Sequence, residues 1–140
     1  MTNPPTIQPP ADAASVSAAP VAFLDRTWGE ALALAEEARD YIAAQGEGER
    51  GAAGLHYALE TTRITACVGQ IIAWLMMQRA VLAGEMSREE ALAPANRIAG
   101  HDACLREPAP WLPPRLADLS DRARRLYVRV ARLDELAARA

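Results

Sequence analysis

Apolar positions recur every three or four residues over three long stretches of the chain, the spacing that places them on one face of an α-helix. The first stretch covers about residues 22–45 and ends before the glycine-rich residues 46–51. Acidic and basic residues occupy the opposite side of this predicted helix. Its apolar stripe consists of Leu24, Trp28, Ala31, Leu32, Ala35, Ala38 and Ile42.

The second stretch, about residues 53–83, is apolar on two opposite sides. One band has large side chains, namely Tyr57, Ile64, Val68, Ile71, Leu75 and Leu82. The opposite band is mostly small and includes two methionines. A helix with two apolar faces packs between two layers, so we expect the large band to face its own bundle. We expect the small band to form a homodimer interface through Ala58, Thr62, Ala66, Gly69, Ala73, Met76 and Met77. The reverse assignment of the two faces is the alternative.

The remainder of the chain predicts a short helix, a loop and a third long helix. Ser87 with Glu90 three residues later is the spacing of a capping box, and Pro94 weakens the helix that follows. Residues 100–119 contain four prolines and are interpreted as a surface loop pinned by Trp111 and Leu112. The last helix is expected to open with Ser120 as its N-cap. The fold class is therefore all-α, a three-helix bundle with an extra short helix and a Pro-rich loop.

Composition divides the chain into a lead and one domain. Residues 1–20 hold five of the ten prolines and few large apolar side chains, so we expect a disordered lead. Residues 21–140 are expected to form a single helical domain. The lead does not have the pattern of a signal peptide, and the uncharged run between Arg63 and Arg79 is shorter than the roughly 20 residues of a membrane span. We therefore expect a cytoplasmic protein that does not enter a membrane.

The cysteines and histidines do not predict a catalytic or metal site. Two cysteines, Cys67 and Cys104, do not make a disulfide framework, and we expect both thiols to be reduced. His56 and Cys67 lie about 16 Å apart along one helix, too far to share a zinc ion. Cys67, mid-helix among apolar neighbours, is interpreted as a small packing residue. With His101 and Cys104 lacking further ligands, we expect no cofactor, no metal and no enzyme activity.

The charge pattern leaves one alternative function open. All fifteen basic residues are arginines, and seven of them lie in residues 115–140, yet the net charge is −3. An arginine-rich surface for nucleic acid is the alternative, but an acidic balance opposes binding that depends on neutralising phosphates. We expect the partner-binding residues to be Arg63, Trp74, Arg122, Arg125, Arg129 and Arg132. For each arginine the alternative is a solvated helix face paired with nearby acids, and for Trp74 it is the rim of the core.

Three segments, FLDRTWGEALALAEEARDY, TTRITACVGQIIAWLMMQRAVLAGEMSREEA and LSDRARRLYVRVARLDEL, together resemble the bacterial family named for the regulator of CtrA degradation, RcdA. The resemblance spans about residues 23–136. It implies a homodimeric bundle of three main helices that acts as a non-enzymatic adaptor, bringing protein substrates and other adaptor components to the ClpXP protease during the cell cycle. The better-known members of that family carry a disordered extension after the last helix, whereas this chain stops at Ala140. If delivery depends on that extension, we expect this chain to bind some partners and to lack full adaptor activity.

Overall fold

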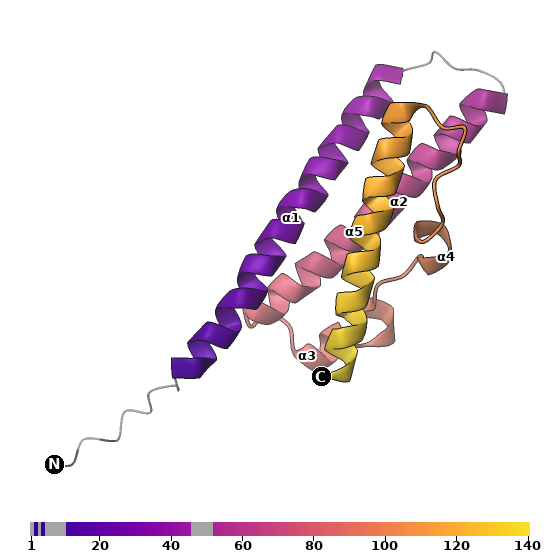
Figure 1. Cartoon of the computed structure of the whole chain (residues 1–140). Coiled ribbons are helices and arrows are strands. Elements are labelled where there is room, and N and C mark those ends of the chain that lie inside the picture. Colours follow the sequence, from indigo (N-terminus) through magenta and orange to yellow (C-terminus); the bar gives the residue numbers. More distant parts are fainter. Residues whose placement is uncertain (1, 3, 5–10, 46–51) are drawn as a thin grey trace.

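A computed structural model describes residues 2, 4, 11–45 and 52–140; for residues 11–20 and 52–53 it describes the backbone alone. Within these residues the chain forms five α-helices, one 3-10 helix and no strand. Figure 1 shows three long helices side by side: α1 (Ala11–Gln45), α2 (Ala52–Leu82) and α5 (Pro114–Arg139). The connection between α2 and α5 holds α3 (Arg88–Ala91), η1 (Pro94–Asn96) and α4 (His101–Cys104). This architecture confirms the predicted all-α bundle.

The core lies where the three long helices meet. The large band of α2 supplies Ile64, Val68, Ile71 and Leu75, all of them buried. Burying side chains of this size is the main favourable contribution to folding. Helices α1 and α5 complete the core with Leu24, Ala31, Leu34, Leu116, Leu119, Ala123, Leu126, Tyr127 and Val130.

Helix α1 begins earlier and packs in a different rotation from the one expected. Its backbone is helical from Ala11, in a segment rich in alanine, the strongest helix former. The lead that we predicted to be disordered covers residues 1–20. The backbone of residues 11–20 is helical, and residues 1, 3 and 5–10 lie outside the described residues. Leu34 is buried, whereas Leu32 and Ile42 are 40% and 44% exposed. Thr27 is buried as well, and its hydroxyl is satisfied by the hydrogen bond that it donates to the Phe23 carbonyl at 2.9 Å.

The first residues of α3 and α5 test two predictions about where these helices begin. The Ser87 hydroxyl accepts a hydrogen bond from the Glu90 amide at 3.0 Å, which confirms the predicted cap of α3. The predicted start of the last helix at Ser120 is wrong, because α5 starts at Pro114. Proline suits the first helical position, where its missing N–H has no partner to lose. Of the two residues expected to pin the preceding loop, Leu112 is buried but Trp111 is 53% exposed.

The structure corrects the expectation of two reduced thiols. Cys67 in α2 and Cys104 in α4 form a disulfide, with their Cα atoms 5.6 Å apart, within the usual range for such a bond. Both residues are buried. Their sequence separation of 37 conceals this proximity, which arises only because the connection folds α4 back against α2.

Candidate interaction surface

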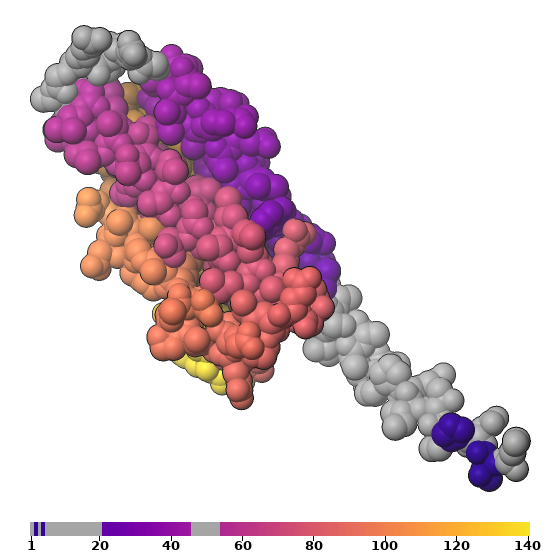
Figure 2. All heavy atoms as spheres, turned by 180° about the vertical axis from the view of Figure 1, so that it is seen from behind, coloured from indigo at the N-terminus to yellow at the C-terminus, as the bar shows by residue number. Residues whose placement is uncertain are grey.

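The side of α2 that faces away from the bundle is apolar and uncovered in the single chain. We call it the outer face, and it consists of Leu55, Ala58, Leu59, Thr62, Ala66, Gly69, Ala73, Met76 and Met77. Met77 is half-buried, and the other eight residues are exposed. Leu55, Leu59 and Met76 are 60%, 59% and 57% exposed. Figure 2 shows α2, in magenta to pink, running uncovered between α1 and the orange segment that contains α4. A contiguous apolar surface of this kind usually marks a binding site.

The threonines on and beside the outer face do not need a partner to satisfy their hydroxyl protons. Thr62 donates to the Ala58 carbonyl at 2.7 Å, and Thr61 donates to the same carbonyl at 3.0 Å. Thr65 donates to the Thr61 carbonyl at 2.8 Å. Because each hydroxyl proton is donated within the helix, burying Thr62 in an interface would leave no hydroxyl proton without an acceptor.

Gly69 lies in the middle of the outer face, and the fold of the single chain does not call for a glycine there. A Cβ atom built at Gly69 meets no described atom within 4 Å, and its φ is not in the positive region. Glycine in a helix interior is less stable than alanine by roughly 0.5–1 kcal/mol. Gly69 therefore leaves open space on α2 where another backbone can approach closely.

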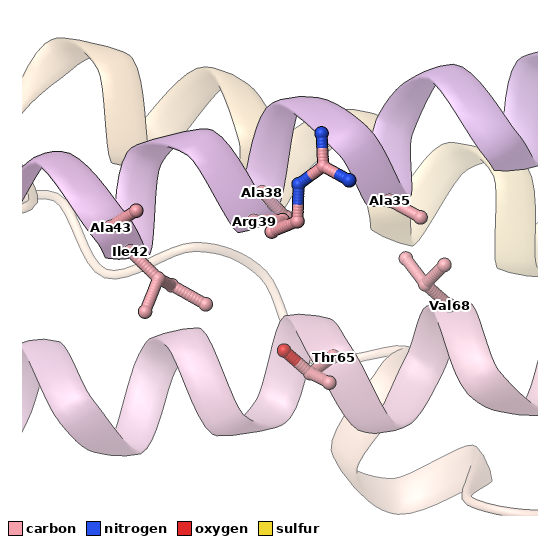
Figure 3. A pocket seen from close by; sticks show the side chains of 7 residues that line it. All are labelled: Ala35, Ala38, Arg39, Ile42, Ala43, Thr65 and Val68. Carbon is pink, nitrogen blue, oxygen red and sulfur yellow. The ribbon is translucent and has the colours of Figure 1, made fainter.

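Two hollows flank the outer face. The first, of about 410 Å³, lies between α1 and α2. Figure 3 shows Ile42 of α1 and Val68 of α2 pointing into it, while the Arg39 guanidinium points away from α2. The second, of about 480 Å³, lies between α2 and the segment after α3, with Leu59 and Ala66 on one wall and Trp111 on the other. The outer face is thus bordered on both sides by space that side chains of a partner can fill.

Arg63, one of the predicted partner-binding residues, is buried and used within the fold. Its guanidinium donates to the Glu60 carboxylate at 2.5 Å, to the Ala103 carbonyl at 3.0 Å and to the Ser120 hydroxyl. Ser120 in turn donates to Glu60 at 2.5 Å. Burial alone would raise the pKa of Glu60, but the hydrogen bonds from Arg63 and Ser120 outweigh it and lower that pKa below its usual value. Arg63 therefore joins α2, α4 and α5.

Trp74 is also inside the bundle, where it fills the core position that we considered as an alternative. It is 5% exposed, and its indole N–H donates to the Asp134 carboxylate at 3.1 Å. Arg97 donates to the other oxygen of that carboxylate at 2.8 Å. A buried indole usually finds such a hydrogen-bond acceptor. Trp74 is thus not available as a surface anchor.

Three of the four predicted arginines on α5 form ion pairs within the chain. Arg122 binds Glu37 of α1 and lies 3.3 Å from Asp118, and Arg129 binds Glu30 of α1. Arg125 lies 2.9 Å from Asp121. Hydrogen bonds from Arg122, and then from Arg115, lower the pKa of Glu37 to about 2. The pairs with Glu37 and Glu30 link α5 to α1, whereas the pair between Arg125 and Asp121 lies within α5.

Arg132 is the exception among these four predicted arginines. It is exposed, and within the described part of the chain it makes no hydrogen bond or ion pair. With three of the four predicted arginines paired to carboxylates, little of the predicted positive stripe is left for nucleic acid, whose binding depends on several phosphate contacts. The structure therefore adds no support to the nucleic-acid alternative.

Neither a metal site nor a membrane span is needed to explain the described residues. No group of three or more His, Cys, Asp or Glu residues among them is arranged to hold a metal ion. Residues Gly54–Leu82 are long and apolar enough to cross a membrane, a test that the core helix of a bundle also passes. Since one face of this helix carries Ile64, Ile71 and Leu75 into the core, we interpret α2 as a core helix.

Sequence reasoning identified the two bands of α2 but missed the surroundings of the outer face. Trp111 contacts the His56 ring, with ring centroids 5.2 Å apart, and helps to wall the second hollow. The hollow beside Ile42 likewise depends on how α1 rotates against α2. No local signal marks either feature, because each is made by residues from two separate elements.

The fold and the outer face define an all-α bundle protein whose most distinctive surface is an uncovered apolar helix. A family model described as "Protein of unknown function (DUF1465)" matches residues 16–140. Among solved structures the chain is similar to the crystal structure of RcdA from Caulobacter crescentus CB15, with 34% identity, a TM-score of 0.65, and coverage of 84% of this chain and 92% of that chain. No curated protein matches. The chain therefore belongs to the DUF1465 family and is an RcdA-like protein; the family's description names no enzyme activity.

Proposed function

We propose that this chain is a non-enzymatic, cytoplasmic adaptor that promotes delivery of protein substrates to the ClpXP protease in cell-cycle control. The likeness to RcdA, at 34% identity over most of both chains, supports the adaptor class. The observation that carries the proposal is the uncovered outer face of α2, because a protein without chemistry of its own acts through the surfaces that it presents. An adaptor that binds a substrate and a protease at the same time, each through weak contacts, raises the local concentration of the substrate near the protease.

We further propose that the outer face pairs with the outer face of a second copy. Apolar side chains such as Leu55, Leu59 and Met76 gain free energy when they leave water, at roughly 25 cal/mol per Å². Gly69 and Ala66 lie between them and permit close approach of two helix backbones. A two-fold pair also brings each copy's protruding side chains toward the hollows that flank the other copy's outer face.

The dimer is tested by the double variant Ala66→Arg, Ala73→Arg. Both side chains point away from the bundle, so the chain still folds, but four buried charges in the paired state prevent association. The matched control is Ala22→Arg, Ala138→Arg, which adds the same charge at two exposed positions elsewhere. Light scattering should give twice the chain mass for the wild type and the control and one chain mass for the outer-face variant. A single-chain mass for the wild type at micromolar concentration would contradict the dimer.

The adaptor activity is tested with purified components. The chain is added at increasing concentration to ClpXP and a cell-cycle substrate recovered with it from cells, with the other adaptor components present. We expect the degradation rate to rise with chain concentration until it saturates. Unchanged degradation, together with no detectable binding of the chain to any of these proteins, would contradict the proposal.

A further inference from the structure

The disulfide between Cys67 and Cys104 is a covalent link between α2 and the segment that precedes α5. Cys67 lies midway along α2, and Cys104 ends the four-residue helix α4. The segment at issue is residues 99–112, which runs from the end of the α3 and η1 region to the start of α5. In residues 99–112, all of which the structure describes, Cys104 and Leu112 are the only buried residues.

Besides the disulfide, ring contacts of His101 and Trp111, the buried side chain of Leu112 and four hydrogen bonds attach this segment to the rest of the bundle. The Ala99 amide donates to the Gln70 side chain at 3.2 Å, and the Ala99 carbonyl accepts from the Tyr127 hydroxyl at 2.7 Å. The Ala103 carbonyl accepts from Arg63 at 3.0 Å, and the Leu105 carbonyl accepts from Arg124 at 3.1 Å. Segments with few buried apolar contacts are the first to open in local unfolding, and the disulfide is a covalent restraint on the opening of this one.

The segment also shapes the surface next to the outer face. The second hollow is walled by Leu59, Thr62 and Ala66 of α2 on one side and by Ala103, Arg106 and Trp111 of the segment on the other. Three residues of the outer face therefore share this hollow with the segment that the disulfide restrains. A change in how firmly the segment is held changes the shape offered at the edge of the outer face.

We propose that Cys67 and Cys104 form a redox-controlled clamp on residues 99–112. In the closing reaction, a small-molecule disulfide such as glutathione disulfide accepts the two electrons of the thiol pair. The thiolate of one cysteine attacks the small disulfide, forms a mixed disulfide and releases one reduced thiol. The second cysteine then attacks the protein sulfur of the mixed disulfide and releases the other, so that two protein thiols become one disulfide and one small disulfide becomes two thiols. Excess dithiol reductant reverses both steps.

The burial of both cysteines sets how this clamp operates. Exchange requires an incoming thiolate to reach a sulfur atom, and neither Cys67 nor Cys104 is accessible in the closed state. The segment must therefore open before the disulfide is reduced. Since cytosolic proteins are kept reduced by the thiol pool, a clamp in such a protein closes when that pool becomes oxidised.

The test compares the full chain equilibrated with glutathione disulfide and with dithiothreitol, by hydrogen exchange and mass spectrometry. We expect backbone amides of residues 99–112 to exchange at least about tenfold faster in the reduced protein, while the core amides of residues 119–131 serve as an internal reference. The variant Cys67→Ser, Cys104→Ser should match the reduced protein in both buffers. Two titratable thiols in the unfolded glutathione-treated chain, or equal exchange of the segment in both states, would overturn the clamp.

A second readout connects the clamp to the outer face, and this part rests on the proposed dimer. Light scattering across a dilution series should give dissociation constants that differ between the oxidised and reduced chain by about threefold or more. Equal constants would overturn the regulatory part. Absence of association in both states would overturn the proposed dimer instead, and the exchange result for residues 99–112 would still decide the clamp.

Discussion

Individual polar residues in this protein act mainly as links between helices. Arg63 is the clearest case, because one guanidinium contacts Glu60 of its own helix, Ser120 of α5 and the Ala103 carbonyl of α4. Every buried side-chain nitrogen or oxygen in the described residues has a hydrogen-bond partner. Removing one member of such a group leaves the others buried and unpaired, which costs more than the hydrogen bond itself contributes.

Replacing Arg63→Ala should therefore lower the free energy of unfolding by about 3 kcal/mol, since the Glu60 carboxylate loses its charge partner while it stays largely out of water. Urea denaturation followed by circular dichroism measures this change. The control is Arg132→Ala, an exposed position on α5, which should change stability by less than about 0.5 kcal/mol. Equal small effects at both positions would show that the buried network contributes little.

A second prediction for a single residue concerns the stability of the fold at low pH. The pKa of Glu37 is about 2 in the folded chain, against 4.5 for the unperturbed carboxyl, because Arg122 and then Arg115 donate hydrogen bonds to it. A carboxyl with a lowered folded pKa contributes its stability in full above the unfolded pKa and loses it as the pH falls through the folded pKa. Stability should thus decline between about pH 5 and pH 2, and Glu37→Gln should flatten that decline in urea titrations. Parallel curves for the two proteins would contradict this assignment.

Helix ends and helix faces decide what each element contributes. Gly84 follows α2 with φ of 75°, and its amide donates to the Val81 carbonyl at 3.1 Å, the left-handed arrangement that often terminates a helix. Gly69, by contrast, lies inside α2 with ordinary helical backbone and open space around it. The same residue type thus has a conformational role at one position and leaves room for a neighbour at the other.

The two glycines predict opposite outcomes for one substitution. In a background that carries Ala73→Arg, which blocks association, Gly69→Ala should raise the free energy of unfolding by about 0.5–1 kcal/mol through better helix propensity. Gly84→Ala should lower it by about 1 kcal/mol, because alanine is strained at positive φ. Neither new Cβ meets a described atom within 4 Å, so the two changes in the free energy of unfolding reflect backbone conformation rather than side-chain packing. Changes of the same sign would contradict the distinction.

At the scale of the whole molecule, the bundle buries one side of α2 and leaves the other bare. Ion pairs between Glu30 and Arg129 and between Glu37 and Arg122 hold α1 to α5, and α4 holds to α2 through the disulfide. All of these links lie away from the outer face. The described residues therefore form a bundle that leaves the outer face exposed.

If two copies share that surface, stability must depend on protein concentration by mass action. The melting temperature of the wild-type chain should rise by several degrees over a hundredfold increase in concentration. The variant Ala66→Arg, Ala73→Arg should melt at a temperature independent of concentration, whereas Ala22→Arg, Ala138→Arg should behave as the wild type. Calorimetry of the three proteins under one buffer condition measures this. A concentration-independent wild type would count against the pairing.

The amino-acid sequence by itself determined the three long helices, the double apolar character of α2 and the cap of α3. These are properties of a few neighbouring residues, since the helical period and the Ser87 hydroxyl act over one or two turns. Only the tertiary structure decided that Arg63 and Trp74 lie inside, that Leu34 rather than Leu32 faces the core, and that Cys67 meets Cys104. Each depends on the rotation of one helix against another or on a connection folding back across 37 residues, and such placement is set by the packing of the whole bundle rather than by any local pattern.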